Sequence, residues 1–244
     1  MTARIEDKFE SGYFWELYID LERQFGNFLE HVPYLQGNEK VYSFRLLNLI
    51  LSVGGHIDSA FKEMARHPLF ASNDSCQKIL RKLRESERNI KNGRAPIPVS
   101  IKDCLAAFEK EYKLASKTVI FKRIPEREDI IPFKPFNPQT NAPAWWDSYN
   151  RLKHDVGVNV REANLQNARD SLAGAFLLNV RHIPAAVRLC EYGIMKTELR
   201  TRKGRITKAF TPPPPSNVQD ILGRGRGIAG VYVETPQFVY DYSQ

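Results

Sequence analysis

The feature that most constrains the fold is a helical segment whose second half is almost wholly apolar. Residues 163–183 have the composition of a helix, and residues 172–178 carry an apolar or small side chain at every position. A helix that is apolar all round is buried on every side rather than along one stripe. The segment therefore predicts the central helix of a bundle, with other helices packed around it.

Other segments supply the surrounding helices. Residues 14–32 and 46–64 repeat apolar side chains at spacings of three and four, and Pro33 and Pro68 end these two helices. The further helices expected are residues 72–93, a helix that begins with the capping box of Ser100 and Asp103, and a short helix after Pro184. The sequence thus predicts an all-α bundle of about five or six helices.

Two regions depart from this helical pattern. Residues 117–136 are rich in β-branched and aromatic side chains and predict a small β-hairpin inserted into the helical domain. From residue 196 the helical period stops, and a proline run and a GRGRG repeat predict an irregular, basic C-terminal arm. Aromatic residues near its end favour a docking strand there. The expected division is a helical domain over residues 1–195 and the arm over residues 196–244.

The charge balance points to a polyanionic partner. The chain has 36 Lys and Arg against 28 Asp and Glu, which gives a net charge of +8. Residues 78–94 alone hold seven cations and two acids. A surface of this kind attracts the phosphates of RNA or DNA. The alternative is an ordinary solvated helix face on a basic protein, and charge alone does not separate the two.

Location and cofactors are limited by what the sequence lacks. No apolar run approaches the roughly 18–20 residues of a membrane span, and the first residues have no apolar core of a signal peptide. A cytoplasmic protein without membrane contact is therefore expected. Cys76, Cys104 and Cys190 are far apart and without CxxC spacing, so free thiols are expected. No metal-ligand spacing or phosphate loop occurs, and no cofactor is expected.

The motif with most chemical content is "WWDSYNRLKH", residues 145–154. On a helix, Trp146, Asn150 and His154 lie one above another at i, i+4 and i+8, with Lys153 beside them. A second stripe, which includes Tyr149, is apolar and expected to pack. An amide, an amine and an imidazole on one face can contact a phosphate and exchange a proton.

Each of these residues also has a structural interpretation. His154 can orient the helix by hydrogen bonding to a backbone carbonyl, and Asn150 can be a buried amide that joins two helices. Trp145 and Trp146 are expected in the core, because a tryptophan buries a large apolar area, and base stacking is the less favoured role for Trp146.

The motif and its context resemble the HEPN superfamily of helical-bundle proteins, in particular uncharacterised prokaryotic members. "YNRLKH" is similar to the family's Arg, polar residue and His motif, with Asn150 and His154 at the last two positions. The segment "PAWW…YN…KH" precedes "ANL…N…SLAGAFLL", and an early "N…YS" opens the second helix. The likeness extends over residues 10–192 as architecture and over residues 142–180 in detail.

The resemblance implies a metal-independent endoribonuclease that acts as a toxin or defence effector. It implies His154 as acid/base. On that basis the hypothesis for this chain places Asn150 and Lys153 on the phosphate and expects substrate contacts from Tyr149, Arg151 and Trp146. The resemblance also implies a homodimer, RNA as substrate, and an antitoxin or other partner protein.

One position departs from the family pattern. Tyr149 stands where the family carries its arginine, and the nearest arginine, Arg151, comes two positions later. A shift of two residues turns a side chain by about 200° around a helix. This departure favours the alternative of a catalytically inactive HEPN-like module that binds nucleic acid or a partner protein.

Overall fold

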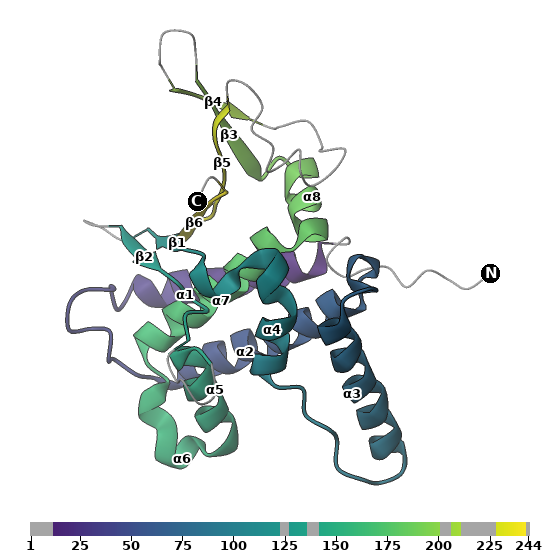
Figure 1. The fold of residues 1–244 in the computed structure, drawn as a ribbon. Helices are drawn as coiled ribbons and strands as arrows, with labels where there is room; N and C mark the ends of the chain where they lie inside the picture. Colours follow the sequence, from purple (N-terminus) through teal and green to yellow (C-terminus); the bar gives the residue numbers. More distant parts are fainter. Residues whose placement is uncertain (1–11, 123–126, 136–141, 201–205, 211–227, 243–244) are drawn as a thin grey trace.

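The computed structural model describes residues 12–122, 127–135, 142–200, 206–210 and 228–242, and it shows a mainly helical protein with one antiparallel sheet (Figure 1). The α-helices are α1 (Tyr13–Leu29), α2 (Phe44–Arg66), α3 (Asp74–Lys91), α4 (Ile101–Tyr112), α5 (Ala144–His154), α6 (Val156–Asn159), α7 (Leu165–Arg181) and α8 (Ile183–Glu191). Short 3₁₀ turns follow α2, α4 and α6: η1 (Pro68–Phe70), η2 (Leu114–Ser116) and η3 (Val160–Glu162).

Side-chain caps fix where several of these helices begin. Ser43 Oγ accepts a hydrogen bond from the Leu46 backbone N–H at 3.2 Å at the start of α2. At the start of α4, Ser100 Oγ accepts from the Asp103 N–H and the Asp103 carboxylate accepts from the Ser100 N–H. The second arrangement is the capping box expected from the sequence, which satisfies backbone donors that a helix end leaves unpaired.

Helix α7 is the central helix, as the sequence predicts. Its Leu172, Phe176 and Leu177 side chains are fully buried, and the helix packs against α1, α2, α5 and α8. The Phe176 ring lies 5.6 Å from the Tyr18 ring of α1 between centroids. Burial on all sides follows from the apolar second half of this segment.

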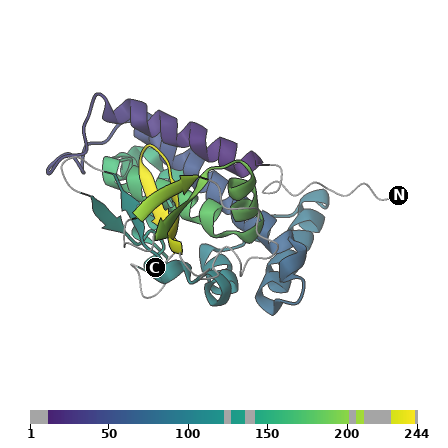
Figure 2. The same cartoon turned by 90° about the horizontal axis from the view of Figure 1, so that it is seen from above.

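Within the described ranges the sheet has six strands in the order β2-β1-β6-β5-β3-β4, with every neighbouring pair antiparallel. The strands are β1 (Val119–Phe121), β2 (Glu128–Ile130), β3 (Met195–Arg200), β4 (Ile206–Phe210), β5 (Ile228–Glu234) and β6 (Phe238–Asp241). Figure 2 shows the strands lying across the helices when the molecule is seen from above. The paired strands β1 and β2 confirm the predicted hairpin.

Two expectations about the fold need correction. The protein is mainly helical rather than all-α, and the described part of the C-terminal arm is not irregular, because it forms four of the six strands. The docking strand expected near the end is confirmed: β6 pairs with β1, with Ile120 opposite Val239. Strands from both sides of the expected boundary at residue 195 therefore share one sheet.

Polar contacts attach this sheet to α1. The buried Glu22 carboxylate accepts from the Thr235 hydroxyl and, at 2.9 Å, from the Gln237 backbone N–H. Within the sheet itself, Lys122 beside β1 forms an ion pair with Glu234 of β5 at 2.9 Å. On the apolar side, the Phe238 ring lies 5.8 Å from that of Phe176 in α7. The turn between β5 and β6 is thus held against the helical layer.

None of the helices in the described residues combines the length and apolar character that crossing a membrane requires. Cys76, Cys104 and Cys190 are buried and in the thiol form.

Candidate functional site

Helix α5 carries the motif. It begins directly after Pro143 and ends at His154, where Asp155 takes over as the N-cap of α6 and accepts from the Val158 N–H at 3.2 Å. The last turn of α5 contains Arg151, Lys153 and His154. Positive charge there is favourable, because the C-terminal end of a helix carries partial negative charge.

One face of α5 fixes the helix in the core. The Trp145 indole N–H donates to the Pro132 carbonyl oxygen at 2.6 Å, and its ring packs 5.9 Å from Phe133. Trp145 also lies against Gly174 of α7, where an added Cβ would be 3.1 Å from the indole. Leu152 has no exposed surface. The packing role predicted for this stripe is confirmed.

Tyr149 brings α5 close to α2. A Cβ placed on Gly54 would lie only 2.3 Å from Tyr149 Cδ2, a distance that real Cβ atoms do not reach. The ring is 6% exposed and lies 5.0 Å from the Trp146 ring. Tyr149 therefore packs between two helices instead of standing free for a substrate.

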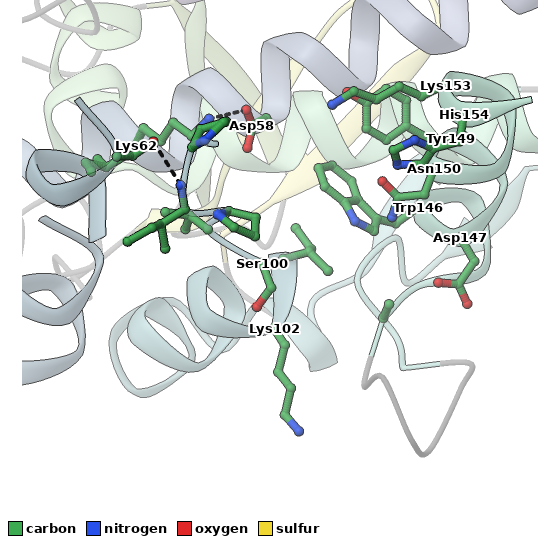
Figure 3. Close-up of a pocket in the computed structure, with 18 residues that line it drawn as sticks. Asp58, Lys62, Ser100, Lys102, Trp146, Asp147, Tyr149, Asn150, Lys153 and His154 are labelled. Carbon is green, nitrogen blue, oxygen red and sulfur yellow. Dashed lines mark hydrogen bonds and ion pairs between the residues drawn. The ribbon is translucent and has the colours of Figure 1, made fainter. Parts of the chain in front are cut away.

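The other face of α5 forms one wall of an open pocket of about 820 Å³. Clefts of this size accommodate small ligands and single nucleotides. Its lining comes from α2 (Asp58, Lys62), α3 (Leu83, Ser86), the chain around the start of α4 (residues 96–102), Ala142, and α5 (Trp146, Asp147, Tyr149, Asn150, Lys153, His154). Figure 3 shows α5 on one side and Asp58 and Lys62 on the other.

Asn150, Lys153 and His154 all line this pocket, as their placement on one helix face predicts. Within the described residues, the side chains of Asn150 and His154 have no hydrogen-bond partner, and both lie at the pocket surface in Figure 3. Lys153 is exposed, and its ammonium nitrogen lies 5.6 Å from the Tyr149 ring centroid. An amide, an amine and an imidazole are thus presented together to one ligand-sized space.

The charges of the pocket are mixed. Lys62 is ion-paired with Asp58, whereas Lys102 and Lys153 form no ion pair among the described residues. Burial raises the pKa of the Asp147 carboxyl, an effect that the nearby charge of Arg151 partly offsets. Asp147 points away from Asn150 and His154 (Figure 3). Lys153 is therefore the pocket lysine without an ion pair in the described residues that shares α5 with His154.

Arg151 and Trp146 were both expected to contact substrate, and the structure places them differently. Trp146 lines the pocket but is only 6% exposed, because it packs between Trp145 and Tyr149. Arg151 lies outside the pocket lining and forms an ion pair with Glu162 of η3 at 3.0 Å. A substrate contact from Arg151 is not supported by this geometry, which agrees with its rotation of about 200° from Tyr149.

The pocket also contains residues that the sequence did not single out for function. The sequence itself assigns no role to Asp58, Lys62 or Lys102, which all line the pocket. They face α5 because α2 packs against it and the start of α4 borders the same pocket. The charged i, i+4 pair of Asp58 and Lys62 was visible in the sequence, but nothing local indicated that it faces His154.

Comparison with known proteins gives no assignment: no protein-family model, no curated protein and no solved structure matches this chain. Among the described residues, no group of three or more His, Cys, Asp or Glu side chains is arranged to hold a metal ion.

Proposed function

We propose that this protein is a HEPN-like, metal-independent endoribonuclease, with the α5 pocket as its site and His154 as the acid/base. The observation that supports this most is that Asn150, Lys153 and His154 open from one helix face into one pocket. The proposed setting is the cytoplasm, where such an enzyme acts as a toxin or defence effector under the control of an antitoxin or other partner protein.

In the proposed reaction the ribose 2′-oxygen attacks the adjacent phosphorus, and the bond from phosphorus to the 5′-oxygen breaks. The products are a 2′,3′-cyclic phosphate and a free 5′-hydroxyl. Neutral His154 takes the proton from the 2′-hydroxyl, and a protonated imidazole gives one to the leaving oxygen. The pocket lining contains one histidine among the described residues, so a second copy of the chain supplies the other imidazole in a homodimer.

Lys153 and Asn150 have electrostatic roles in this proposal. Negative charge develops on the phosphate oxygens as the new bond forms, and donors already in place stabilise it without reorganisation. The Lys153 ammonium supplies a positive charge and the Asn150 amide an N–H donor. A lysine lacks the bidentate geometry of the arginine that the family carries, so slower cleavage than with arginine is expected.

The decisive test is cleavage of a labelled RNA with the metal chelator EDTA present. His154→Ala should reduce the rate by about 10²-fold or more, the usual contribution of a general acid/base. His31→Ala, an exposed histidine after α1, is the matched control and should leave the rate unchanged. Equal cleavage by His154→Ala and the wild type would remove the assignment.

The two neighbouring cations of α5 provide a second test. Lys153→Gln should lower kcat by about 10-fold to 10²-fold, since it removes charge stabilisation in the transition state. Arg151→Gln should change it less than twofold, because Arg151 lies outside the pocket lining and pairs with Glu162. Equal losses in the two variants would contradict the assignment of Lys153.

A second candidate function is a catalytically inactive HEPN-like module that binds RNA or a partner protein. The packing of Tyr149 against Gly54 and the ion pair of Arg151 favour it, because no arginine then faces the pocket in the described residues. Salt-sensitive RNA binding without any cleavage would select this candidate.

A further inference from the structure

Helix α3 extends from the rest of the helical layer and is covered on one side only (Figure 1). Cys76 and Ile79, both near its start, are its only buried residues. Further along, the chain that leads into α4 returns beside it: Ser86 Oγ accepts from the Ile97 N–H at 3.2 Å, and Lys82 pairs with Asp103 at 2.8 Å. These contacts lie on the side of α3 that faces the pocket.

The opposite side of α3 carries a stripe of four exposed cations, Arg81, Arg84, Arg88 and Lys91. Their spacing of three, four and three residues aligns them along one face, and at 1.5 Å per residue the stripe is about 15 Å long. Counting about 100° per residue, this face lies well over 90° from Ile79 and Ser86. We call these four residues the α3 stripe.

No ion pair among the described residues neutralises the α3 stripe. Glu85 and Glu87 lie on the same helix, yet neither forms an ion pair with a stripe cation. Like charges three and four residues apart destabilise a helix by about 0.2–0.5 kcal/mol per pair, and Glu85 and Glu87, at the same spacings from the stripe cations, offset this by a similar amount. The helix dipole compensates for Arg88 and Lys91 in the last turn but not for Arg81 and Arg84. The stripe therefore leaves a row of exposed positive charge without ion-pair partners among the described residues.

We propose that the α3 stripe binds the phosphodiester backbone of an RNA strand. Four aligned cations, three of them arginines with bidentate geometry for phosphate, match a row of phosphates in charge. A lipid surface fits less well, because a helix that lies in a membrane interface inserts an apolar face. The apolar face of α3 already packs on the protein through Ile79, and Leu80 and Leu83 are packed against the core.

This inference shares RNA as the partner with the proposed function but does not depend on cleavage. The α3 stripe faces away from the α5 pocket, although Leu83 and Ser86 of the same helix line that pocket. An RNA strand held on the stripe is thus kept close to the pocket by contacts that read no sequence. Binding can therefore be measured in a His154→Ala background, where the strand stays intact.

The experiment measures the affinity of a fluorescein-labelled 30-nucleotide single-stranded RNA at several salt concentrations, in full-length His154→Ala protein. The stripe variant replaces all four stripe cations with Gln. The control variant makes the same charge change at four exposed cations elsewhere: Arg45, Lys110, Arg127 and Lys134. We expect the stripe variant to bind about 10²-fold more weakly at 50 mM salt, and its slope of log K against log salt to fall by about 3. The control should stay within about fivefold of the His154→Ala parent.

Three outcomes would overturn the inference. Equal weakening in the stripe and control variants would mean that only net charge matters. Unchanged binding in the stripe variant would place the RNA elsewhere, and His154-dependent cleavage of RNA would then still stand by itself. Stripe-dependent binding of vesicles of phosphatidylcholine and phosphatidylserine, with no binding of RNA, would identify a membrane surface instead.

Discussion

Helices α7 and α3 are nearly equal in length, 17 and 18 residues, but are stabilised in different ways. Thirteen residues of α7 are buried, against Cys76 and Ile79 in α3. Most helical stability in proteins comes from tertiary packing, and an isolated helix of this length is marginal in water. Helix α7 is therefore stabilised by packing against its neighbours. Helix α3 is stabilised by its cap, a few polar contacts and one short apolar patch. The difference leaves α3 with a surface available for binding.

The largest expected effect is on the packing of α7. Phe176→Ala removes a fully buried ring that packs on Tyr18 and Phe238, and it should lower the free energy of unfolding by about 3–5 kcal/mol. Ile90→Ala on α3 removes a side chain that is 60% exposed, and it should change the free energy of unfolding by about 0.5 kcal/mol or less. Urea denaturation measures both, and comparable losses would contradict the contrast between the helices.

A buried histidine beside α7 should make stability depend on pH. Burial lowers the pKa of His56, which lies 3.3 Å from the Asn179 amide of α7, to about 4. Its unfolded pKa is about 6.5, so between these values the unfolded chain binds more protons and stability falls as the pH falls. The loss from pH 7 to pH 4 should approach roughly 3 kcal/mol.

The control for this acid dependence is His56→Gln, which keeps a polar group at the site but cannot titrate. Between pH 7 and pH 4, the free energy of unfolding of this variant should fall by roughly 3 kcal/mol less than that of the wild type. Parallel pH profiles for the two proteins would show that His56 is not the group responsible.

An intermediate effect is expected where α5 approaches α2. Gly54→Ala places a methyl group 2.3 Å from the Tyr149 ring and should destabilise the protein by about 1–3 kcal/mol. Gly55→Ala is the neighbouring control, since its Cβ meets nothing within 4 Å and alanine favours a helix by about 1 kcal/mol. The two substitutions should therefore shift the thermal midpoint in opposite directions.

The smallest effect concerns the start of α3. Asn73 Oδ1 accepts from the Cys76 N–H at 3.0 Å, and Asn73→Ala should cost about 1 kcal/mol. Asn27→Ala, an exposed asparagine on α1, should cost about 0.5 kcal/mol or less. If α3 depends on its cap as argued, hydrogen exchange in α3 should accelerate in the first variant and not in the second.

The helical part of the fold was predictable because its signals are local. The apolar run of α7, the prolines after α1 and α2, and the Ser100 capping box each depend on residues close in the chain. The sheet was not predictable as a whole. Ile120 pairs with Val239 and Thr197 with Val231, and no local pattern specifies such distant partners.

The site was predictable only on the side that one helix supplies. The i, i+4 spacing of Asn150 and His154 placed both on the pocket face of α5. The opposite wall depends on how α2 packs against α5 and on where the start of α4 lies beside the pocket, which sequence spacing does not encode. The partner of Arg151 was missed for the same reason, since Glu162 approaches it only after the turn through α6.

The pairing of β1 with β6 has a consequence for biosynthesis. A chain emerging from the ribosome exposes the edge of β1 long before Phe238 and Val239 have been translated. Until then the backbone of Ile120 and Phe121 offers hydrogen bonds to any extended segment nearby, which is a route to misfolding. Ribosome-bound chains that stop before β6 should therefore recruit chaperones more strongly than chains that include it.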